Sequence, residues 1–516
     1  MGSRRFAALV VMAGLLGAAA ACGSDDSDSS EGATATSAGA DGSTSSTQRG
    51  TADAVAQPTS MEDWDALWQK ERDAIVERIK SSGWGTSKDG KKVTGSDGYT
   101  MDLAKCPAGW SQTEGMTDTT IKIGLVGPQS GPGAEAAGIG FAHEVLFDHY
   151  NDNGGFPDNT GKTRSVQMIL RDDAYDPTKT IPLVDELIDS EHVFAVETTG
   201  SPSTLRTYEK LNQRCIPQPL PASGHPAFGD PVNHPWTTTS SINYATEAVL
   251  WGQFLEKHLD EFGGKAKVAS LRINSEFGAS YDAAFKGYLA TSEHKDDIVY
   301  VSQTMEPTAA TATDEMTTLA AEHPDMFIAM TTGAPCSQII NEAAQNGMNE
   351  DVKYKFISSA CKATTPMASL GEAGDGWWTV GGGLKDIDNS SYDDDAFIVA
   401  ARQWMADAGK KMSPSYNLGF YYSWTLAQAL EIAGQLDGGL NRSNLILALR
   451  TIDMTNPMLL PGLNVKMDGN ADAYLLEGSD ISQWHTDSGA WAQDSITVLD
   501  VQTPNCAWDQ AAGRCA

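Results

Sequence analysis

Short apolar strands and amphipathic helices alternate twice along this chain, and this alternation limits the possible folds more than any other feature. The first series has three strand patterns and three helix patterns: strands at 120–126, 165–170 and 193–197, and helices ending near 150 and spanning 179–189 and 203–213. The second series has four of each: strands at 267–272, 297–303, 325–330 and 354–358, and helices at 242–260, 280–292, 314–322 and 337–347. Such spacing is typical of parallel sheets with helices on both faces. The sequence therefore predicts an α/β fold with two doubly wound parallel-sheet lobes.

The segments outside the two series predict smaller additions. Trp64 to Ile79 has apolar residues at helical spacing, and a Gly- and Lys-rich stretch follows to about residue 105. We expect a small appended helical element there. Three more helix patterns follow the second series, at 395–408, 418–436 and 441–451, and the chain from 463 onward is strand-like with turns.

The first sixty residues are not expected to belong to the fold. Arg4 and Arg5 precede an unbroken run of apolar and small residues from 6 to 21, which is typical of a signal peptide. Cys22 follows directly, as in a bacterial lipoprotein signal whose cysteine becomes lipidated. Ordinary cleavage, with Cys22 as a bystander, is the alternative. Residues 23 to about 60 are Ser, Thr, Gly, Ala and Asp, which predicts a disordered tether.

Six further cysteines predict disulfides, because an exported chain meets an oxidising environment. Cys506 and Cys515 are close enough in sequence to close a short C-terminal loop. Cys336 and Cys361 each follow a predicted strand of the same sheet. Cys106 with Cys215 then remains by elimination, and would pin the N-terminal extension to the first lobe.

Composition and motifs argue against several classes of protein. The 516 residues carry a net charge of −32, which repels phosphate backbones and anionic lipid headgroups. We therefore expect no nucleic-acid partner, and contact with a membrane only through a lipid anchor. His143-Glu144 lacks the second histidine of a zinc helix, and no G-x-S-x-G elbow is present. The sequence predicts no metal, no cofactor and no catalytic residues.

Three loops that follow strands of the first lobe are rich in small and hydroxyl residues. Ligands of doubly wound sheets lie outside the carboxyl ends of the strands. The candidate residues in these loops are Ser130, Ser201, Ser203, Thr204, Ala222, Ser223 and Gly224. The alternative for each loop is that serine and glycine only cap helices and form turns.

These loops carry a family resemblance. Ser130-Gly131-Pro132, Arg171 to Pro177 (RDDAYDP), Gly200 to Thr204 (GSPST) and Pro221-Ala222-Ser223 together resemble type I periplasmic binding proteins of the leucine/isoleucine/valine-binding branch. The resemblance spans about residues 118–490. It implies two lobes joined by a three-crossover hinge, a ligand in the cleft and closure on binding.

The implied boundaries divide the chain into six parts. They are a signal peptide at 1–21, an anchor and tether at 22–60, a helical extension at 61–117, a first lobe at 118–241 and about 381–465, a second lobe at 242–380 and about 466–505, and a disulfide-closed tail at 506–516.

The resemblance also implies roles for individual positions. Ser201 would bind a ligand carboxylate, and the Ala222 carbonyl would receive a ligand ammonium. Phe277 and Thr332 fall at wall positions of the second lobe. Ala360 stands where amino-acid binders have an acid that pairs the ammonium, and a buried cation without a partner is costly. The resemblance therefore leaves open amino acids, amides and other carboxylates, with a standard branched-chain amino acid disfavoured.

The sequence thus predicts an extracytoplasmic solute-binding lipoprotein, anchored to the cell membrane, that is not an enzyme. Its partners would be a small solute and the permease and ATPase of an ABC importer. A ligand sensor of the same fold and an extracellular hydrolase are the alternatives.

Overall fold

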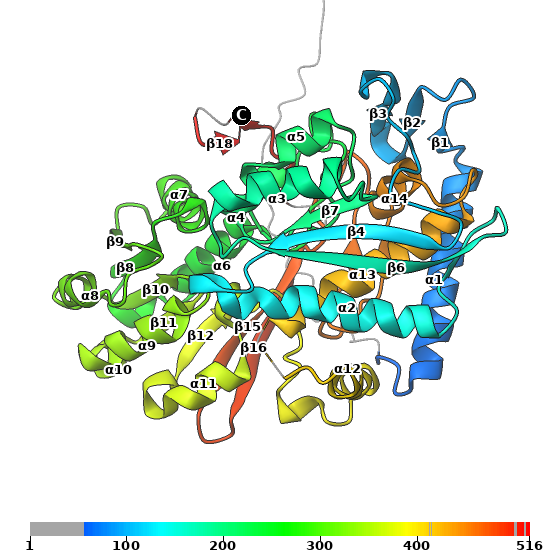
Figure 1. The fold of residues 1–516 in the computed structure, drawn as a ribbon. Helices are drawn as coiled ribbons and strands as arrows, with labels where there is room; N and C mark the ends of the chain where they lie inside the picture. The colour runs from blue at the N-terminus through cyan, green and yellow to red at the C-terminus, as the bar shows by residue number, and fades with distance from the viewer. Residues whose placement is uncertain (1–55, 412, 414, 500–502, 510–511, 516) are drawn as a thin grey trace, which may run out of the picture. The chain divides into compact units, whose positions relative to one another are not determined.

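The structure, a computed structural model, is a two-lobed α/β protein, as predicted (Figure 1). It describes residues 56–411, 413, 415–499, 503–509 and 512–515, all within one compact unit of the chain. The predicted signal peptide, the predicted lipidation site Cys22 and most of the predicted tether lie outside these residues. Gln57 already donates a hydrogen bond to the carbonyl of Leu459, so the chain is docked three residues before the predicted end of the tether.

The first lobe is built on a four-stranded sheet in the order β5-β6-β4-β7. β4 (Thr120–Gly127) lies parallel to β6 (Thr163–Asp172) and β7 (Ala195–Thr198), while β5 (Phe156–Pro157) is an antiparallel edge. Both faces of β4 are buried, because Ile123 and Leu125 belong to one apolar cluster and Val126 to another. The helices of this lobe are α2 (Ala137–Asp152), α3 (Pro177–Asp189), α4 (Ser201–Leu205), α5 (Tyr208–Gln213), α12 (Ala396–Asp407), α13 (Tyr416–Gln435) and α14 (Arg442–Leu449).

The second lobe is built on a seven-stranded sheet in the order β16-β15-β12-β11-β10-β8-β9. Its strands are β8 (Ala266–Ile273), β9 (Ile298–Met305), β10 (Met326–Met330), β11 (Tyr354–Ile357), β12 (Trp377–Val380) and the antiparallel hairpin β15 (Gly478–His485) and β16 (Ala490–Val498). Period-two alternation is clear in β10, where Ile328 and Phe327 belong to different apolar clusters. The helices of this lobe are α6 (Tyr244–Lys257), α7 (Glu276–Thr291), α8 (Thr313–Ala320), α9 (Pro335–Gln345), α10 (Met348–Asp351) and α11 (Thr364–Leu370).

The chain passes between the two sheets three times before the C-terminal tail. The passages lie before α6, between β12 and α12, and between β14 (Val465–Lys466) and β15. The tail then returns to the first lobe, where the Cys506 N–H donates to the Gly229 carbonyl and the ring of Trp508 lies 4.6 Å from that of His225. This last return was not predicted. The exact lobe boundaries inferred from the sequence stay predictions.

The N-terminal extension packs on the first lobe through α1 (Met61–Ser81), which confirms the predicted helix. Trp64 and Trp68 are buried on one face of α1, and the Trp68 ring lies 5.3 Å from that of Trp424 on α13. The stretch after α1 forms an antiparallel sheet of β1 (Gly85–Thr86), β2 (Lys92–Thr94) and β3 (Thr100–Asp102), which the sequence did not predict. Strands of two or three residues are too short to show a period.

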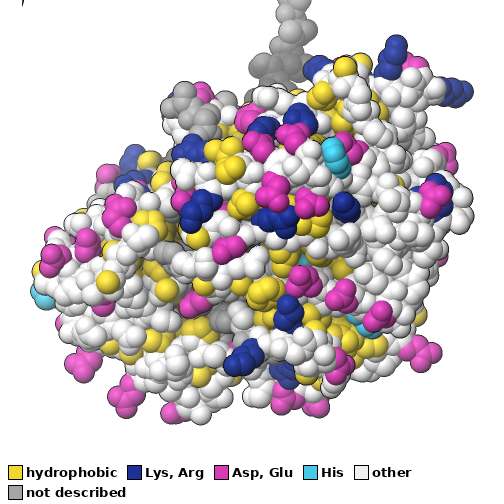
Figure 2. Space-filling model, viewed as in Figure 1, with side chains coloured by type: hydrophobic (Ala, Val, Ile, Leu, Met, Phe, Trp, Pro, Cys, Tyr) yellow, Lys and Arg dark blue, Asp and Glu magenta, His cyan; other side chains and the backbone are white. Residues whose placement is uncertain are grey.

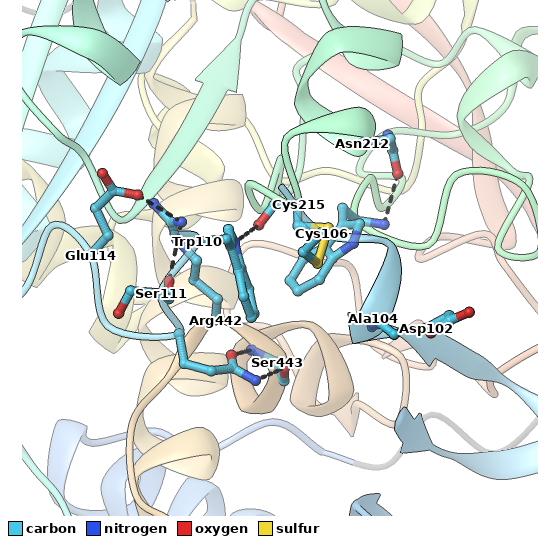
Figure 3. Close-up of a disulfide and its surroundings, with 12 residues drawn as sticks. Asp102, Ala104, Cys106, Trp110, Ser111, Glu114, Asn212, Cys215, Arg442 and Ser443 are labelled. Carbon is cyan, nitrogen blue, oxygen red and sulfur yellow. Dashed lines mark hydrogen bonds and ion pairs between the residues drawn. A yellow bond between two sulfur atoms is a disulfide. The ribbon is translucent and has the colours of Figure 1, made fainter. Parts of the chain in front are cut away.

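All three predicted disulfides are present: Cys106–Cys215, Cys336–Cys361 and Cys506–Cys515. Figure 3 shows the first of them with its surroundings. Trp110 Nε1 donates to the Cys215 carbonyl at 2.8 Å, and Arg442 of α14 pairs with Glu114 at 3.2 Å. These contacts fasten the extension to the first lobe, as the pairing implied.

Candidate functional site

A cavity of about 1370 Å³, its open mouth included, lies between the two lobes. Its walls come from loops after strands of both lobes, from the hinge passages and from α13. Five predicted residues line it: Ala222, Ser223, Phe277, Thr332 and Ala360. Their role in binding a ligand remains a prediction.

The first-lobe wall begins at a strained turn after β6. Ala174 and Tyr175 both have left-handed backbones, with φ of 54° and 62°, which costs non-glycine residues about 1–3 kcal/mol each. Asp172 and Asp173 hold this turn, because their carboxylates accept from the N–H groups of Ala174 and Tyr175 at 2.9 Å. The turn directs the Tyr175 ring onto Gly200 on the cavity wall. A Cβ on Gly200 would lie 2.5 Å from that ring, so this position requires glycine.

Ser130 and Ser203 do not line the cavity, contrary to prediction. The Ser130 hydroxyl donates to Asp172 at 2.6 Å, and the Ser203 hydroxyl donates to Asp173 at 2.9 Å. Both hydroxyls therefore brace the strained turn instead of facing a ligand. The first two acids of the RDDAYDP motif, Asp172 and Asp173, are thus structural.

Thr204 and Gly224 are also wrong as wall residues. The Thr204 hydroxyl donates to the Gly200 carbonyl and lies 2.8 Å from the Thr198 hydroxyl, which closes the first turn of α4. Gly224 packs under the hinge, where an added Cβ would lie 2.1 Å from the Ile242 carbonyl oxygen. Close backbone packing therefore accounts for Gly224, and a hydrogen bond to the backbone of its own helix accounts for the Thr204 hydroxyl.

Ser201 lies one layer behind the wall. It is fully buried, and its hydroxyl shares a hydrogen bond of 2.8 Å with that of Ser223, which does line the cavity. The Ala222 carbonyl accepts from the Gly200 N–H at 3.0 Å. Ser223 is therefore the hydroxyl that this loop presents to the cavity.

The second-lobe wall is held from behind by a buried carboxyl group. Glu247 of α6 accepts from the Tyr281 hydroxyl at 2.6 Å and from the N–H and hydroxyl of Ser359 at 2.7 and 2.8 Å. Burial raises the pKa of Glu247 to about 7, although these hydrogen bonds lower it. Ser359 and Ala360, which line the cavity, are thus fixed to α6.

A buried ion pair holds the next residues of the same loop. Lys362 Nζ lies 2.7 Å from Asp480 of β15 and donates to the Leu384 carbonyl at 3.0 Å. The two side chains are only 8% and 1% exposed. Lys362 lines the main cavity and also a neighbouring one of about 330 Å³. The disulfide Cys336–Cys361 ties the same loop to α9.

Aromatic residues that sequence reasoning missed complete the cavity. Tyr244 begins α6 at the hinge, where its ring stacks on Tyr281 at 4.4 Å and meets the edge of Phe277 at 5.0 Å. Tyr421 and Tyr422 reach the cavity from α13. The one available signal was the pair of adjacent tyrosines in a mostly apolar helix, because a buried tyrosine hydroxyl needs a partner.

A hydrogen bond and an ion pair join the two lobes. Asn389 Nδ2 donates to the Thr364 hydroxyl at 3.0 Å, and Arg206 pairs with Glu276 at 3.3 Å. These contacts are typical of a two-lobed protein with its lobes together.

Comparison with known proteins identifies this architecture. A family model described as periplasmic binding protein matches residues 120–482. The chain belongs to this periplasmic binding protein family. Its fold is that of the type I members, and the leucine/isoleucine/valine-binding branch is among its structural relatives.

Solved structures of periplasmic binding proteins share the fold. An ABC transporter substrate-binding protein from Aeropyrum pernix is 18% identical, with a TM-score of 0.62 over 74% of this chain and 96% of its own. A branched-chain amino acid ABC transporter protein from Thermus thermophilus with bound valine is 16% identical, with a TM-score of 0.62 over 75% and 98%. A solute-binding protein of an ABC transporter from Rhodopseudomonas palustris, in complex with 3,4-dihydroxybenzoic acid, is 19% identical, with a TM-score of 0.60 over 74% and 98%. No curated protein sequence matches this chain.

Two further observations concern the described part of the chain. It contains no group of three or more His, Cys, Asp and Glu side chains placed to hold a metal ion. Within the same residues, no helix has both the length and the apolar character needed to cross a bilayer.

Proposed function

We propose that this protein is an extracytoplasmic solute-binding lipoprotein that captures a small molecule between its lobes and delivers it to the permease and ATPase of an ABC importer. The observation that carries the proposal is the interlobe cavity, with walls from both lobes and three chain passages beside it. A cavity built from two lobes can close around its contents by hinge motion. The family membership and the substrate-binding descriptions of structural relatives support this function.

The surface is consistent with a carrier of small molecules. Figure 2 shows acidic and basic side chains intermixed over one face, with hydrophobic side chains near its middle. The net charge of −32 disfavours a polyanionic partner.

A thermal-shift screen against a metabolite library tests the function. A compound that binds only the folded protein raises Tm by mass action. We expect at least one small metabolite to do so, and native mass spectrometry to recover it unchanged. Turnover of the compound would instead support the hydrolase, and a screen without any hit would contradict the binding function.

The lipid anchor has its own test. Cys22 is the proposed lipidation site. We expect the parent protein to incorporate labelled fatty acid and to sediment with membranes, and Cys22→Ala to do neither. Labelling of the Cys22→Ala protein would contradict the anchor, while leaving the cavity's function untouched.

A further inference from the structure

Two charged residues, Glu135 and Lys362, line the described part of the main cavity. They are not equally available to a ligand. Lys362 is already neutralised by Asp480 at 2.7 Å and bonded to the Leu384 carbonyl. A ligand carboxylate would therefore meet no free cation in this lining.

Glu135 has no such partner. It lies in the short 3₁₀ helix Gly131–Ala136 that leads into α2, and no hydrogen bond or ion pair to its carboxylate occurs among the described residues. Its backbone carbonyl, by contrast, is fixed, because the hydroxyls of Ser413 and Ser415 donate to it. Glu135 as a whole is exposed, and partial desolvation of its carboxyl raises the pKa of that group.

The wall around these charges is mostly apolar and aromatic. Its aromatic members are Tyr175, Tyr244, Phe277, Tyr421 and Tyr422, and its aliphatic members include Ile139, Ile242, Ile273 and Leu476. Aromatic faces attract cations as well as apolar groups. The cavity therefore suits a molecule with an apolar body and a positively charged end.

We propose that the cavity binds an apolar amine and that Glu135 is the counter-charge for its ammonium group. This rests on the proposed function and names the class of solute. The acid expected for an ammonium in the second lobe is absent at Ala360, whereas Glu135 offers one from the first lobe. The strongly negative protein also attracts cations and repels anions.

Three probes with the same phenyl ring and chain length test the proposal on the full chain: 3-phenylpropylamine, 3-phenylpropanamide and 3-phenylpropanoate. We expect the amine to bind most tightly by calorimetry at pH 7.5, about tenfold more tightly than the carboxylate, since a hydrogen bond to a charged group has that effect. Glu135→Gln should reduce the amine's affinity to that of the amide. Glu144→Gln is the matched control. Glu144 is an acid of α2 that pairs with Lys410 and lies outside the cavity lining. This variant should leave the affinities for the amine and for the amide unchanged.

Other results would overturn the proposal. Binding of the carboxylate as tightly as the amine, or an amine affinity unchanged in Glu135→Gln, would remove Glu135 from the site. If none of the three probes binds while the metabolite library yields a hit, the amine proposal fails and the solute-binding function stands. If neither the probes nor the library binds, both proposals fail.

Discussion

The two walls of the cavity are built differently, although both come from loops that follow parallel strands. The first-lobe wall presents Ser223, Thr199 and Gly200, with Ser201 behind it, and its hydroxyls bond mainly to one another and to backbone. The second-lobe wall is fixed by the buried Glu247, by the Lys362–Asp480 pair and by a disulfide. Neutral hydroxyls can exchange a protein partner for a ligand at little cost, whereas a buried charge cannot lose its partner.

We infer that the first lobe supplies adaptable hydrogen bonds and the second supplies a preformed surface. Preorganised walls raise affinity because less conformational freedom is lost on binding. The comparison predicts that substitutions of the buried charged groups that hold the second-lobe wall mainly affect stability, whereas those on the first-lobe wall mainly affect affinity.

The largest expected effect comes from Lys362→Met. It leaves Asp480 buried without a counter-charge, which costs about 3–5 kcal/mol of unfolding free energy. Lys210→Met breaks a half-exposed pair with Asp185 and should cost less than about 1 kcal/mol. Urea unfolding of both variants measures the difference. Equal losses of unfolding free energy in the two variants would mean that the buried Lys362–Asp480 pair stabilises the protein no more than an exposed pair does.

Glu247→Gln tests the same wall through pH. The folded pKa of about 7 lies above the ordinary 4.5, so only the folded state keeps this proton as the pH rises between these values. This group's stabilising contribution is complete below pH 4.5, falls as the pH rises to about 7, and is then constant. The glutamine variant lacks this loss. We expect its stability relative to the parent to rise over this range by up to about 3 kcal/mol.

Unfolding curves at pH 5 and pH 8 give that difference. Glu77→Gln, on the exposed part of α1, changes the same group without burial and serves as the control. A difference between Glu247→Gln and the parent that is the same at both pH values would contradict a buried, protonated Glu247.

The first-lobe wall should respond more weakly and in affinity. Ser223→Ala and Ser201→Ala remove the same hydrogen bond between hydroxyls, but only Ser223 lines the cavity. We expect Ser223→Ala to weaken binding of a library hit by about 1 kcal/mol, with a smaller change for Ser201→Ala. If both variants bind the library hit as tightly as the parent protein does, this loop does not contact the solute.

The sequence predicted the fold better than the site for a physical reason. Strands such as β10 and helices such as α1 follow local periodicity, and the disulfides follow from spacing and the order of the strands. The direction in which a hydroxyl points cannot be predicted from local sequence, because it depends on a hydrogen-bond partner in another loop. Ser130 and Ser203 were therefore mistaken for ligand contacts although Asp172 and Asp173 bind them.

Sequence reasoning missed other cavity residues for the same physical reason. Tyr244, Tyr421 and Lys362 reach the cavity from the hinge, from a late helix and from a loop paired with β15. No local pattern brings these segments together, since only the three passages of the chain between the lobes do so.

Calorimetric titration of a library hit into Ala360→Trp tests the central claim most directly, that the interlobe cavity holds the solute. Ala360 lies exposed on the cavity wall, so an indole there would fill the space and leave the core intact. We expect binding to be lost while the unfolding midpoint stays near that of the parent. Unchanged affinity in this variant would mean that the solute binds elsewhere.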